Sequence, residues 1–496
     1  MRPGNTTVPL RTPAMCPLFD TRHFRVSHPP TWRSTPQHVS MKGTRVVSFP
    51  YTRHPMPPRN LSIILFACVI SLLCYQKAPR SREARTIVHT IETINNNYVE
   101  PVDSRELFEN AMRGMVGELD QYSSYIAPES YLRFQESLDQ QFGGIGILVE
   151  GPPQAEQLTV VSPLVGSPAY DAGVQAGDII LQIGDTDTQE MTLEDAVPLM
   201  RGAEGSAVEL VVRHMGDDEP VKLSVKRAVI QTESVLGDTR ASDGTWNYFL
   251  EEDPRIGYIR LNTFGEHTSA ELREALAFRD HPVQGLIIDL RGNAGGLLKS
   301  AVDICNMFIN GGRIVRTRGR GGQILQEHKA DAESTVLDAN LPLVILVDRF
   351  SASASEIVAA CLQDHDRAVL VGERTWGKGS VQNIIELEGG DSAIRLTTAT
   401  YWRPSGKNIH RRKAPYEADD AEEWGVQPNE GFRVELTEEE TRQVAETRRD
   451  RDVVRTNAAG ETVTTPEEKE HFDDPQLRKA IDYLEQQIQE TQPKAA

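Results

Sequence analysis

Two stretches of the sequence combine residue types that could carry nucleophilic chemistry. Residues 348–357 read DRFSASASEI and residues 371–382 read VGERTWGKGSVQ. No histidine lies within seven residues of the first stretch, so a serine there would need another base. A neutral lysine can be that base, because burial lowers a reference pKa of about 10.4 by several units. Lys378, between Gly377 and Gly379, could therefore accept the proton of a serine.

The serine stretch also has a purely structural interpretation. It follows the apolar run PLVILVD and precedes the helical pattern SEIVAACLQDH, so it forms a strand-to-helix turn. Ser353 and Glu356 have the spacing of a capping box, and this stretch taken alone favours a helix cap. In open α/β sheets, however, sites gather at the carboxyl ends of strands, and a helix N-terminus favours developing negative charge. Whether the Ser353 oxygen faces Lys378 or its own helix stays open.

The elements around these stretches predict a mixed α/β, multidomain fold. Residues 256–402 alternate strand and helix patterns, which predicts βαβ units and a mostly parallel sheet. Residues 142–227 have β character, and residues 84–120 predict two helices that break at Val99-Glu100-Pro101. Residues 436–475 are charged and predict a solvated helix or a linker, followed by an amphipathic helix over DPQLRKAIDYLEQQIQ.

Composition limits the partners and the redox chemistry. The net charge is −19 and no Lys/Arg run is present, so we expect no nucleic acid partner, because an acidic body repels phosphate. Of five cysteines, Cys305 and Cys361 lie in the folded body. Their spacing predicts no disulfide framework, and their apolar helical context predicts buried free thiols.

The N-terminal region predicts export. Residues 1–60 hold nine Lys/Arg and one acid, and residues 61–75 read LSIILFACVISLLCY. This run is short for a membrane span, which needs about 20 apolar residues, but fits an export signal. We interpret residues 56–80 as a signal peptide or signal anchor, and favour an uncleaved anchor because no A-x-A site follows. Residues 1–55 form a basic leader that is either untranslated or disordered, since Met56 begins a more conventional leader.

Seven segments, in this order, resemble the C-terminal processing peptidase, or tail-specific protease, family of serine peptidases (family S41 with a PDZ domain). They are GMVGELDQYSSYI (114–126), FGGIGILVE (142–150), SPAYDAGVQAGDIILQIGD (167–185), DLRGNAGGLL (289–298), VDRFSASASEIVAACLQDH (347–365), GERTWGKGSVQ (372–382) and IRLTTATYWRPSGKNIH (394–410). One segment would be weak, whereas the ordered set is very specific.

The resemblance implies a role for particular residues. Ser353 would be the nucleophile, Lys378 its base, and Gln382 the residue that orients Lys378. The backbone N–H groups of Ala354 and Gly296 would form the oxyanion hole. Positions four apart in a strand lie about 13 Å apart, so contact between Lys378 and Gln382 requires the backbone to curl at residues 377–379.

The resemblance also implies a domain order. The predicted parts are an N-terminal helical segment (81–141), a PDZ domain (142–227), a serine peptidase core (228–435) and a charged C-terminal segment with a terminal helix (436–496). PDZ domains bind peptides by strand addition at a sheet edge. The loop that would bind a substrate's C-terminal carboxylate comprises Phe142, Gly143, Gly144, Ile145 and Gly146.

The sequence departs from the family at Ala294, Trp376 and His410, and none of these changes removes a catalytic side chain. His410 could line the cleft. His365 lies three helical turns beyond Ser353, about 18 Å along the axis, so it cannot reach this serine within its own helix. The remaining histidines considered look like surface or turn residues: His214, His267 and His281.

Three functions are weighed. The first is an exported serine endopeptidase, needing neither metal nor cofactor, that cleaves proteins near free C-terminal tails. It would lie in the cell envelope, on the periplasmic side, anchored to the inner membrane by residues 61–75. The second is a PDZ adaptor on a silent peptidase body, and the third is a latent peptidase. Loss of Ser353, Lys378 or Gln382 would have favoured the adaptor. The helical termini could mediate homo-oligomerisation.

Overall fold

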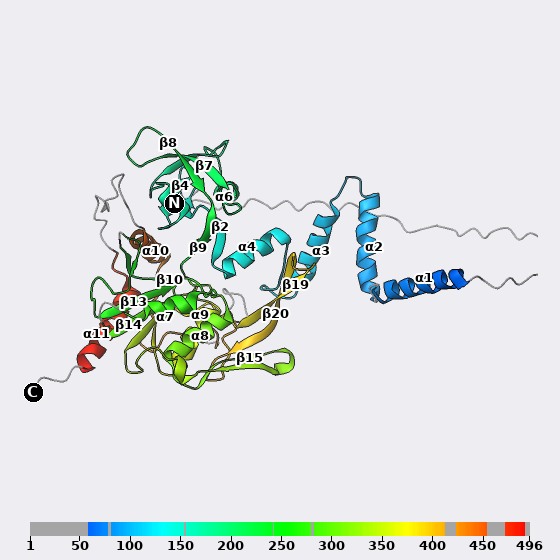
Figure 1. Ribbon diagram of the computed structural model, residues 1–496. Coiled ribbons are helices and arrows are strands. Elements are labelled where there is room, and N and C mark those ends of the chain that lie inside the picture. Colours follow the sequence, from blue (N-terminus) through cyan, green and yellow to red (C-terminus); the bar gives the residue numbers. More distant parts are fainter. Residues whose placement is uncertain are drawn as a thin grey trace, which may run out of the picture. The chain divides into compact units, whose positions relative to one another are not determined.

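The computed structural model describes residues 58–77, 81–152, 155–241, 243–278, 282–411, 423–453 and 472–491. The predicted basic leader, residues 1–55, lies outside this part of the chain. The chain divides into two compact units, Met1–Thr86 and Ile87–Ala496. Figure 1 shows the elements along the chain.

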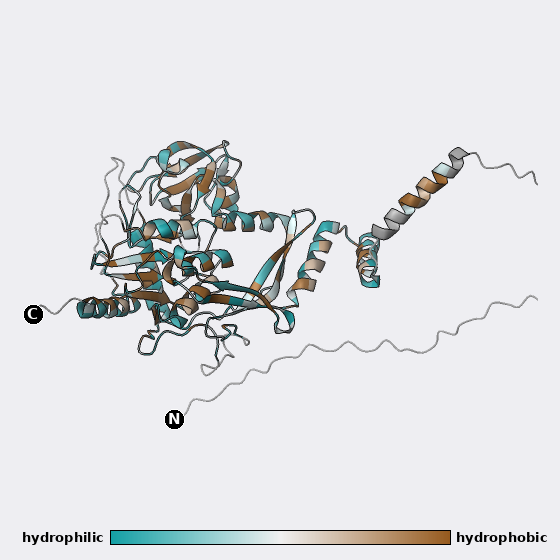
Figure 2. Cartoon of the chain, turned by 60° about the horizontal axis from the view of Figure 1, so that its bottom comes forward, coloured by the Kyte–Doolittle hydropathy of each residue, from teal (hydrophilic) through white to brown (hydrophobic). Residues whose placement is uncertain are grey.

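The N-terminal helices are α1 (Pro58–Lys77), α2 (Arg82–Asn97), α3 (Ser104–Gly117) and α4 (Pro128–Leu138). The break between α2 and α3 confirms the two helices predicted around Val99-Glu100-Pro101. Residues 62–71 of α1 are exposed and mostly hydrophobic (Figure 2). Within the described ranges, no helix has both the length and the apolar content needed to cross a membrane. The anchor at residues 61–75 therefore stays a prediction.

The PDZ-like part is a small antiparallel sheet in the order β3-β4-β5-β7-β8, with β6 paired to β5. Its elements are β3 (Ile147–Glu150), β4 (Thr159–Pro163), α5 (Pro168–Asp171), β5 (Ile179–Ile183), β6 (Thr186–Asp187), α6 (Leu193–Met200), β7 (Ala207–Arg213) and β8 (Val221–Lys226). Strand β2 (Gln141–Gly144) leads into it and pairs antiparallel with β9 (Ala228–Gln231), which leads out. The entry and exit of the inserted domain therefore lie side by side.

The peptidase core is built on a second sheet in the order β10-β13-β14-β17-β18. Its strands are β10 (Val235–Leu236), β13 (Ile256–Leu261), β14 (Gly285–Asp289), β17 (Leu343–Val347) and β18 (Val369–Gly372). The last four run parallel, as the alternating pattern predicted. Their carboxyl ends therefore meet at one edge of the sheet.

Helices cover both faces of this parallel sheet. Side chains such as Leu286 and Ile288 pack with α7 (Thr268–Ala275), α8 (Leu298–Phe308) and α9 (Ala354–Asp364). The alternate residue Ile287 packs with α11 (Pro475–Thr491). Because strand side chains alternate between faces, burial on both sides explains why these strands are apolar throughout.

A third, antiparallel sheet has the order β1-β20-β15-β16, with β19 paired to β20. It comprises β1 (Ser124–Ile126), β15 (Arg313–Arg318), β16 (Ile324–Lys329), β19 (Ser380–Leu387) and β20 (Ser392–Trp402). Short elements complete the described core: β11 (Thr239–Arg240), β12 (Trp246–Asn247), η1 (Arg320–Gly322) and η2 (Ala332–Ser334). Pairing of β1 with β20 brings the DQYSSYI segment beside the strands that follow Lys378.

The charged segment after the core forms α10 (Glu438–Asp452). The prediction of a solvated helix or linker is wrong for one side of this helix. Arg448 and Arg451 are only 12% and 18% exposed, and both pair with the buried carboxylate of Asp238. Composition alone suggested solvation, because the pairing residue lies far away in the sequence.

We predict that α11 is part of the folding core. Leu484 is fully buried and lies on β14, where a Cβ added to Gly285 would come 3.2 Å from it. Leu484→Ala should therefore lower the free energy of unfolding by about 2–5 kcal/mol, measured by urea titration. Gln486→Ala, at an exposed position of the same helix, should change it by less than about 0.5 kcal/mol. Equal effects of the two variants would contradict this packing.

Candidate active site

Ser353 occupies the turn between β17 and α9, residues 348–354, which we name the serine turn. Its backbone has φ 56° and ψ −110°, a region that non-glycine residues rarely adopt and that clusters at functional sites. The side chain is buried, with 6% of the residue exposed. Ala354 is the first residue of α9, so its N–H belongs to the helix N-terminus, as predicted for an oxyanion donor.

Glu356 joins this turn to the segment that carries Lys378. Its fully buried carboxylate accepts hydrogen bonds from the backbone N–H groups of Ser353 (2.9 Å), Gly377 (2.7 Å) and Lys378 (2.8 Å), and from the Thr375 hydroxyl (2.5 Å). Burial raises the pKa of Glu356, and these hydrogen bonds act against that rise. The local sequence predicts only the cap on Ser353 and gives no signal for the link to Lys378.

The segment Thr375–Gly379, which we name the lysine turn, curls as the sequence required. Gly377 has φ 86°, and a Cβ there would lie 2.8 Å from the Arg411 Cβ. A Cβ on Gly379 would lie 2.4 Å from the backbone nitrogen of His410. Only glycine fits both positions without displacing neighbouring backbone, and β19 begins directly afterwards at Ser380.

The environment of Lys378 shifts its amine toward the neutral form. Burial lowers the pKa of Lys378, the positive charge of Arg395 lowers it further, and Glu356 acts in the opposite direction. The Lys378 Nζ also lies 5.4 Å from the centre of the Tyr122 ring. Arg395 holds Tyr122 by donating from Nε to its carbonyl (3.1 Å). The quoted motifs contain Tyr122 and Arg395, but the sequence analysis assigned them no role.

The Ser353 side chain contacts the Tyr401 hydroxyl, and the sequence analysis had assigned no role to Tyr401. Burial raises the pKa of Tyr401 to about 12, and the contact with Ser353 acts against this rise. Tyr401 comes from β20 and is 5% exposed. A phenol from the third sheet therefore lies next to the Ser353 side chain.

The loop after β14, residues 291–297, which we name the glycine loop, packs directly on the serine turn. A Cβ on Gly295 (φ 102°) would lie 2.8 Å from the Ser353 Cβ and 2.9 Å from the Ala354 nitrogen. A Cβ on Gly296 (φ 152°) would lie 2.3 Å from the Phe264 carbonyl oxygen. Gly295 therefore packs against Ser353, and the predicted donor Gly296 is the next residue. No signal in the sequence indicates the role of Gly295.

Asn293 fixes the glycine loop from inside. Its Nδ2 donates to the Leu261 carbonyl (2.6 Å), and its Oδ1 accepts from the Gly295 N–H (2.8 Å). Its own carbonyl accepts from the Ala352 N–H (3.0 Å) and from the Ser355 hydroxyl (2.9 Å). The loop and the serine turn therefore form one hydrogen-bonded unit.

Gln382 was predicted to orient Lys378. Its amide nitrogen donates to the hydroxyls of Ser380 (2.8 Å) and Thr397 (3.1 Å), within a β-bulge of the β19–β20 pairing. The orienting role stays a prediction.

The carboxylate-binding loop predicted in the PDZ domain differs from the observed backbone. Phe142, Gly143 and Gly144 lie in β2, paired with β9, and only Ile145 and Gly146 form a connection to β3. The Ile145 and Gly146 carbonyls accept from the N–H groups of Ala169 (2.9 Å) and Leu164 (2.9 Å). The first three residues therefore lie in a paired strand and not in a loop. Binding of a carboxylate stays a prediction.

A cavity of about 630 Å³ lies between the PDZ domain and the peptidase core. Phe142, Ile147 and Leu148 line its PDZ side, and Gly292 and Phe350 line its core side. Its walls thus run from the edge strand β3 to the backs of the glycine loop and the serine turn.

The histidines have structural contacts. His365 Nε2 lies 2.7 Å from the Arg313 carbonyl oxygen, and His267 precedes α7. His214 opens a turn, because its carbonyl accepts from the Asp217 N–H (3.1 Å), and its side chain is 15% exposed and lies 2.7 Å from the buried Asp178 carboxylate. His281 lies outside the described residues, and the His410 ring lies 6.5 Å from that of Tyr122, so its cleft role stays open.

The predicted buried free thiols are confirmed at Cys305 and Cys361.

Comparisons with known proteins identify the family of this chain. Family models match residues 255–429 (peptidase family S41), 159–214 (PDZ domain) and 74–130 (activating protease CtpB N-terminal domain). The carboxy-terminal-processing protease of Bartonella bacilliformis is 39% identical over 323 residues, 64% of this chain and 70% of that protein. The carboxy-terminal processing protease CtpA of Bacillus subtilis is 34% identical over 324 residues, 65% of each chain. A solved structure of a photosystem II D1 C-terminal processing protease is 27% identical, with a TM-score of 0.39, over 72% of this chain and 93% of that one.

The chain therefore belongs to the carboxy-terminal processing proteases of peptidase family S41 and carries a PDZ domain, as the ordered segments predicted. It is a serine peptidase of this class.

We predict that Glu356→Gln abolishes most of the peptidase activity. An amide at this position presents N–H groups to backbone donors, so the serine and lysine turns lose their shared acceptor. Displacement of about 1 Å between reacting groups costs on the order of 10² in rate, and kcat should fall at least that far. Glu386→Gln, which removes the same charge at an exposed position of β19, should leave kcat unchanged. Full activity of Glu356→Gln would refute the bridging role.

Proposed function

We propose that this protein cleaves other proteins near their free C-terminal tails with a Ser353–Lys378 dyad. The observation that carries the proposal is that the turns of a buried serine and a half-buried lysine share the Glu356 carboxylate. An exposed lysine is protonated and cannot accept a proton. Burial and Arg395 lower the pKa of Lys378, so its neutral form can accept one.

The chemistry proceeds by acyl transfer. The Ser353 oxygen attacks the scissile carbonyl carbon while its proton passes to the neutral Lys378 Nζ. The backbone N–H groups of Ala354 and Gly296 bind the oxyanion. The C–N bond then breaks as Lys378 returns the proton to the leaving amine, which leaves an ester on Ser353. Water, deprotonated by Lys378, attacks this ester and restores the serine.

The PDZ domain would select the tail. Strand β3 is the edge of its sheet and pairs with β4 on one side, so its other side is open to strand addition. Ile147 and Leu148 of this strand line one wall of the cavity. Gly292 of the glycine loop and Phe350 of the serine turn line the opposite wall. A tail added to β3 would therefore extend toward the peptidase core.

We also propose an exported, envelope location on the periplasmic side, with residues 61–75 as an inner-membrane anchor. The support is the basic flank and the apolar run in the sequence. Mass spectrometry of the mature N-terminus would show whether residues 61–75 are retained. Cleavage after this run would exclude the anchor.

We predict that both members of the dyad are required. Ser353→Ala, Lys378→Ala and Lys378→Arg should each lower kcat by at least about 10³-fold, because alanine removes the reacting group and arginine, which stays protonated, cannot accept a proton. The assay compares one protein substrate with a free carboxyl terminus and the same substrate with an amidated terminus. The free form should be cleaved faster. Cleavage of neither form by the wild type would favour an adaptor, and normal turnover by a dyad variant would exclude this mechanism.

We predict that Arg395 lowers the pH at which kcat/KM begins to rise, which is the acid limb of the pH profile. Activity requires neutral Lys378, so it rises with pH through the pKa of this lysine. Because the charge of Arg395 lowers that pKa, Arg395→Gln should move the limb of kcat/KM to higher pH, by up to about one unit. Arg395→Lys keeps the charge and should leave the limb near its wild-type position. An unshifted limb in Arg395→Gln would contradict this electrostatic role.

A further inference from the structure

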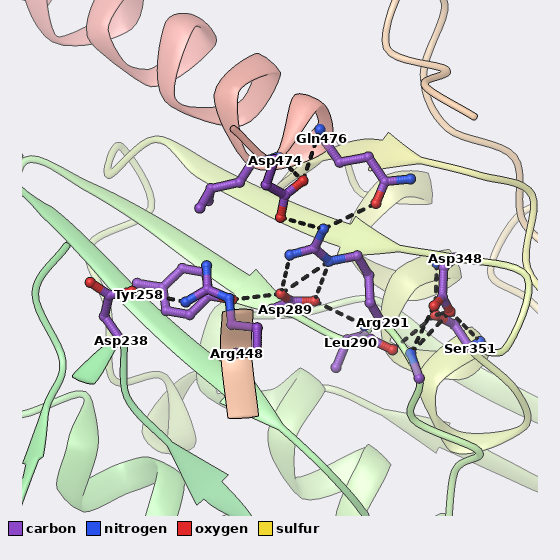
Figure 3. Close-up of polar contacts among 12 residues, drawn as sticks. Asp238, Tyr258, Asp289, Leu290, Arg291, Asp348, Ser351, Arg448, Asp474 and Gln476 are labelled. Carbon is purple, nitrogen blue, oxygen red and sulfur yellow. Dashed lines mark hydrogen bonds and ion pairs between the residues drawn. The ribbon is translucent and has the colours of Figure 1, made fainter. Parts of the chain in front are cut away.

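A buried network of charges lies behind the serine turn (Figure 3). Asp289, the last residue of β14, pairs with Arg291 through Nε (3.0 Å to Oδ1) and through a terminal nitrogen (2.7 Å to Oδ2). The two side chains are 5% and 8% exposed. Burial alone would raise the pKa of Asp289, but the Arg291 guanidinium holds it at about 2, so the pair is ionised.

The C-terminal helix supplies the other partners of Arg291. Its remaining terminal nitrogen donates to Asp474 Oδ2 (2.8 Å) and to Gln476 Oε1 (3.1 Å). Gln476 is fully buried, and its Nε2 donates to the Val434 carbonyl (2.8 Å). Asp289 and the start of α11 therefore hold the planar guanidinium from two sides, which leaves it little rotational freedom.

Asp474 has a second, separable contact. Its Oδ1 accepts from the backbone N–H groups of Gln476 and Leu477, both at 3.1 Å, which caps the first turn of α11. One oxygen thus serves the helix and the other serves Arg291. A substitution that keeps the cap but removes the charge can separate the two roles.

Arg291 is continuous with the groups next to Ser353. The Gly292 N–H donates to both oxygens of the Asp348 carboxylate, each at 3.0 Å. Asp348 also accepts from the Ser351 N–H (2.9 Å), and the Ser351 hydroxyl donates to the Leu290 carbonyl (2.8 Å). The backbone on both sides of Arg291 is therefore tied to the serine turn, as Figure 3 shows.

We propose that Asp474 and Gln476 are positioning residues for the peptidase reaction. By holding Arg291, they fix the glycine loop at the place where Gly296 can present its N–H to the oxyanion. The expected change in kcat rests on the proposed function, whereas the expected change in the glycine loop does not. It gives residues 472–491, for which the family resemblance offered no counterpart, a part in the active site.

The test compares Asp474→Asn with Asp473→Asn. Asparagine is as good an N-cap as aspartate, so the first variant should keep α11 folded and protected while losing the ionic contact with Arg291. The second variant removes the same charge one residue away, where the side chain is 73% exposed and pairs with Arg478. Asp474→Asn should lower kcat about tenfold or more with an unchanged KM, and Asp473→Asn should match the wild type.

Hydrogen exchange gives a readout that does not need activity. The N–H groups of Gly292 and Gly295 are hydrogen-bonded in the wild type. Peptides that cover residues 290–297 should exchange faster in Asp474→Asn than in Asp473→Asn or the wild type, while α11 keeps its protection.

The outcomes are distinct. Wild-type kcat and exchange in Asp474→Asn would overturn the proposal. A fall in kcat that accompanies a fall in Tm and loss of protection in α11, with the glycine loop unchanged, would show a helix cap only and would also overturn it. If the wild type cleaves nothing, the proposed function fails, but the exchange comparison still decides whether Asp474 positions the loop.

Discussion

The active site depends on one buried carboxylate placed between two turns. Strands β17 and β18 are parallel neighbours, so the turns that follow them leave the sheet at the same edge. Glu356 accepts hydrogen bonds from the backbone of both turns. An isolated buried carboxylate costs several kcal/mol, which its donors offset only when both turns are in place. The distance between the Ser353 and Lys378 backbones is therefore coupled to the satisfaction of this group.

Chemistry at the serine also needs a dry environment, and a different sheet supplies it. Tyr401 and Arg395 come from β20, and Tyr122 is held beside them through β1. The Tyr122 ring lies 5.4 Å from the Lys378 Nζ, and partial burial and the positive charge of Arg395 lower the pKa of this lysine. The parallel sheet positions the backbone of the proposed dyad, and the antiparallel sheet contributes the charge and the rings around its lysine. Neither sheet alone would give a serine with a competent base.

Patterns local in sequence predicted much of this arrangement. The apolar run before Ser353 and the helical pattern after it were enough to place the strand, turn and helix, and the glycines around Lys378 indicated the curl. Contacts between distant segments could not be read in this way. From the sequence, Glu356 is predicted only to cap a helix. In the structure it also accepts hydrogen bonds from the backbone of the lysine turn. Nothing near Gly295 or Tyr401 in the sequence indicates Ser353 as a neighbour, and Asp238 lies more than two hundred residues from Arg448 and Arg451.

The C-terminal segment shows why charge content misleads about burial. Two helices of this segment converge on Asp289: α11 through Arg291, and α10 through Arg448, which lies 4.5 Å from the ring centre of Tyr258. The Tyr258 hydroxyl donates to Asp289 at 2.6 Å. Breaking one member of such a network leaves an uncompensated charge. The network therefore allows fewer arrangements of its side chains than apolar contacts would. Arg449 of α10 also pairs with Glu150 of the PDZ edge strand β3 at 2.9 Å. The C-terminal segment therefore contacts both the strand proposed to bind a tail and, through Asp474 and Arg291, the glycine loop proposed to bind the oxyanion.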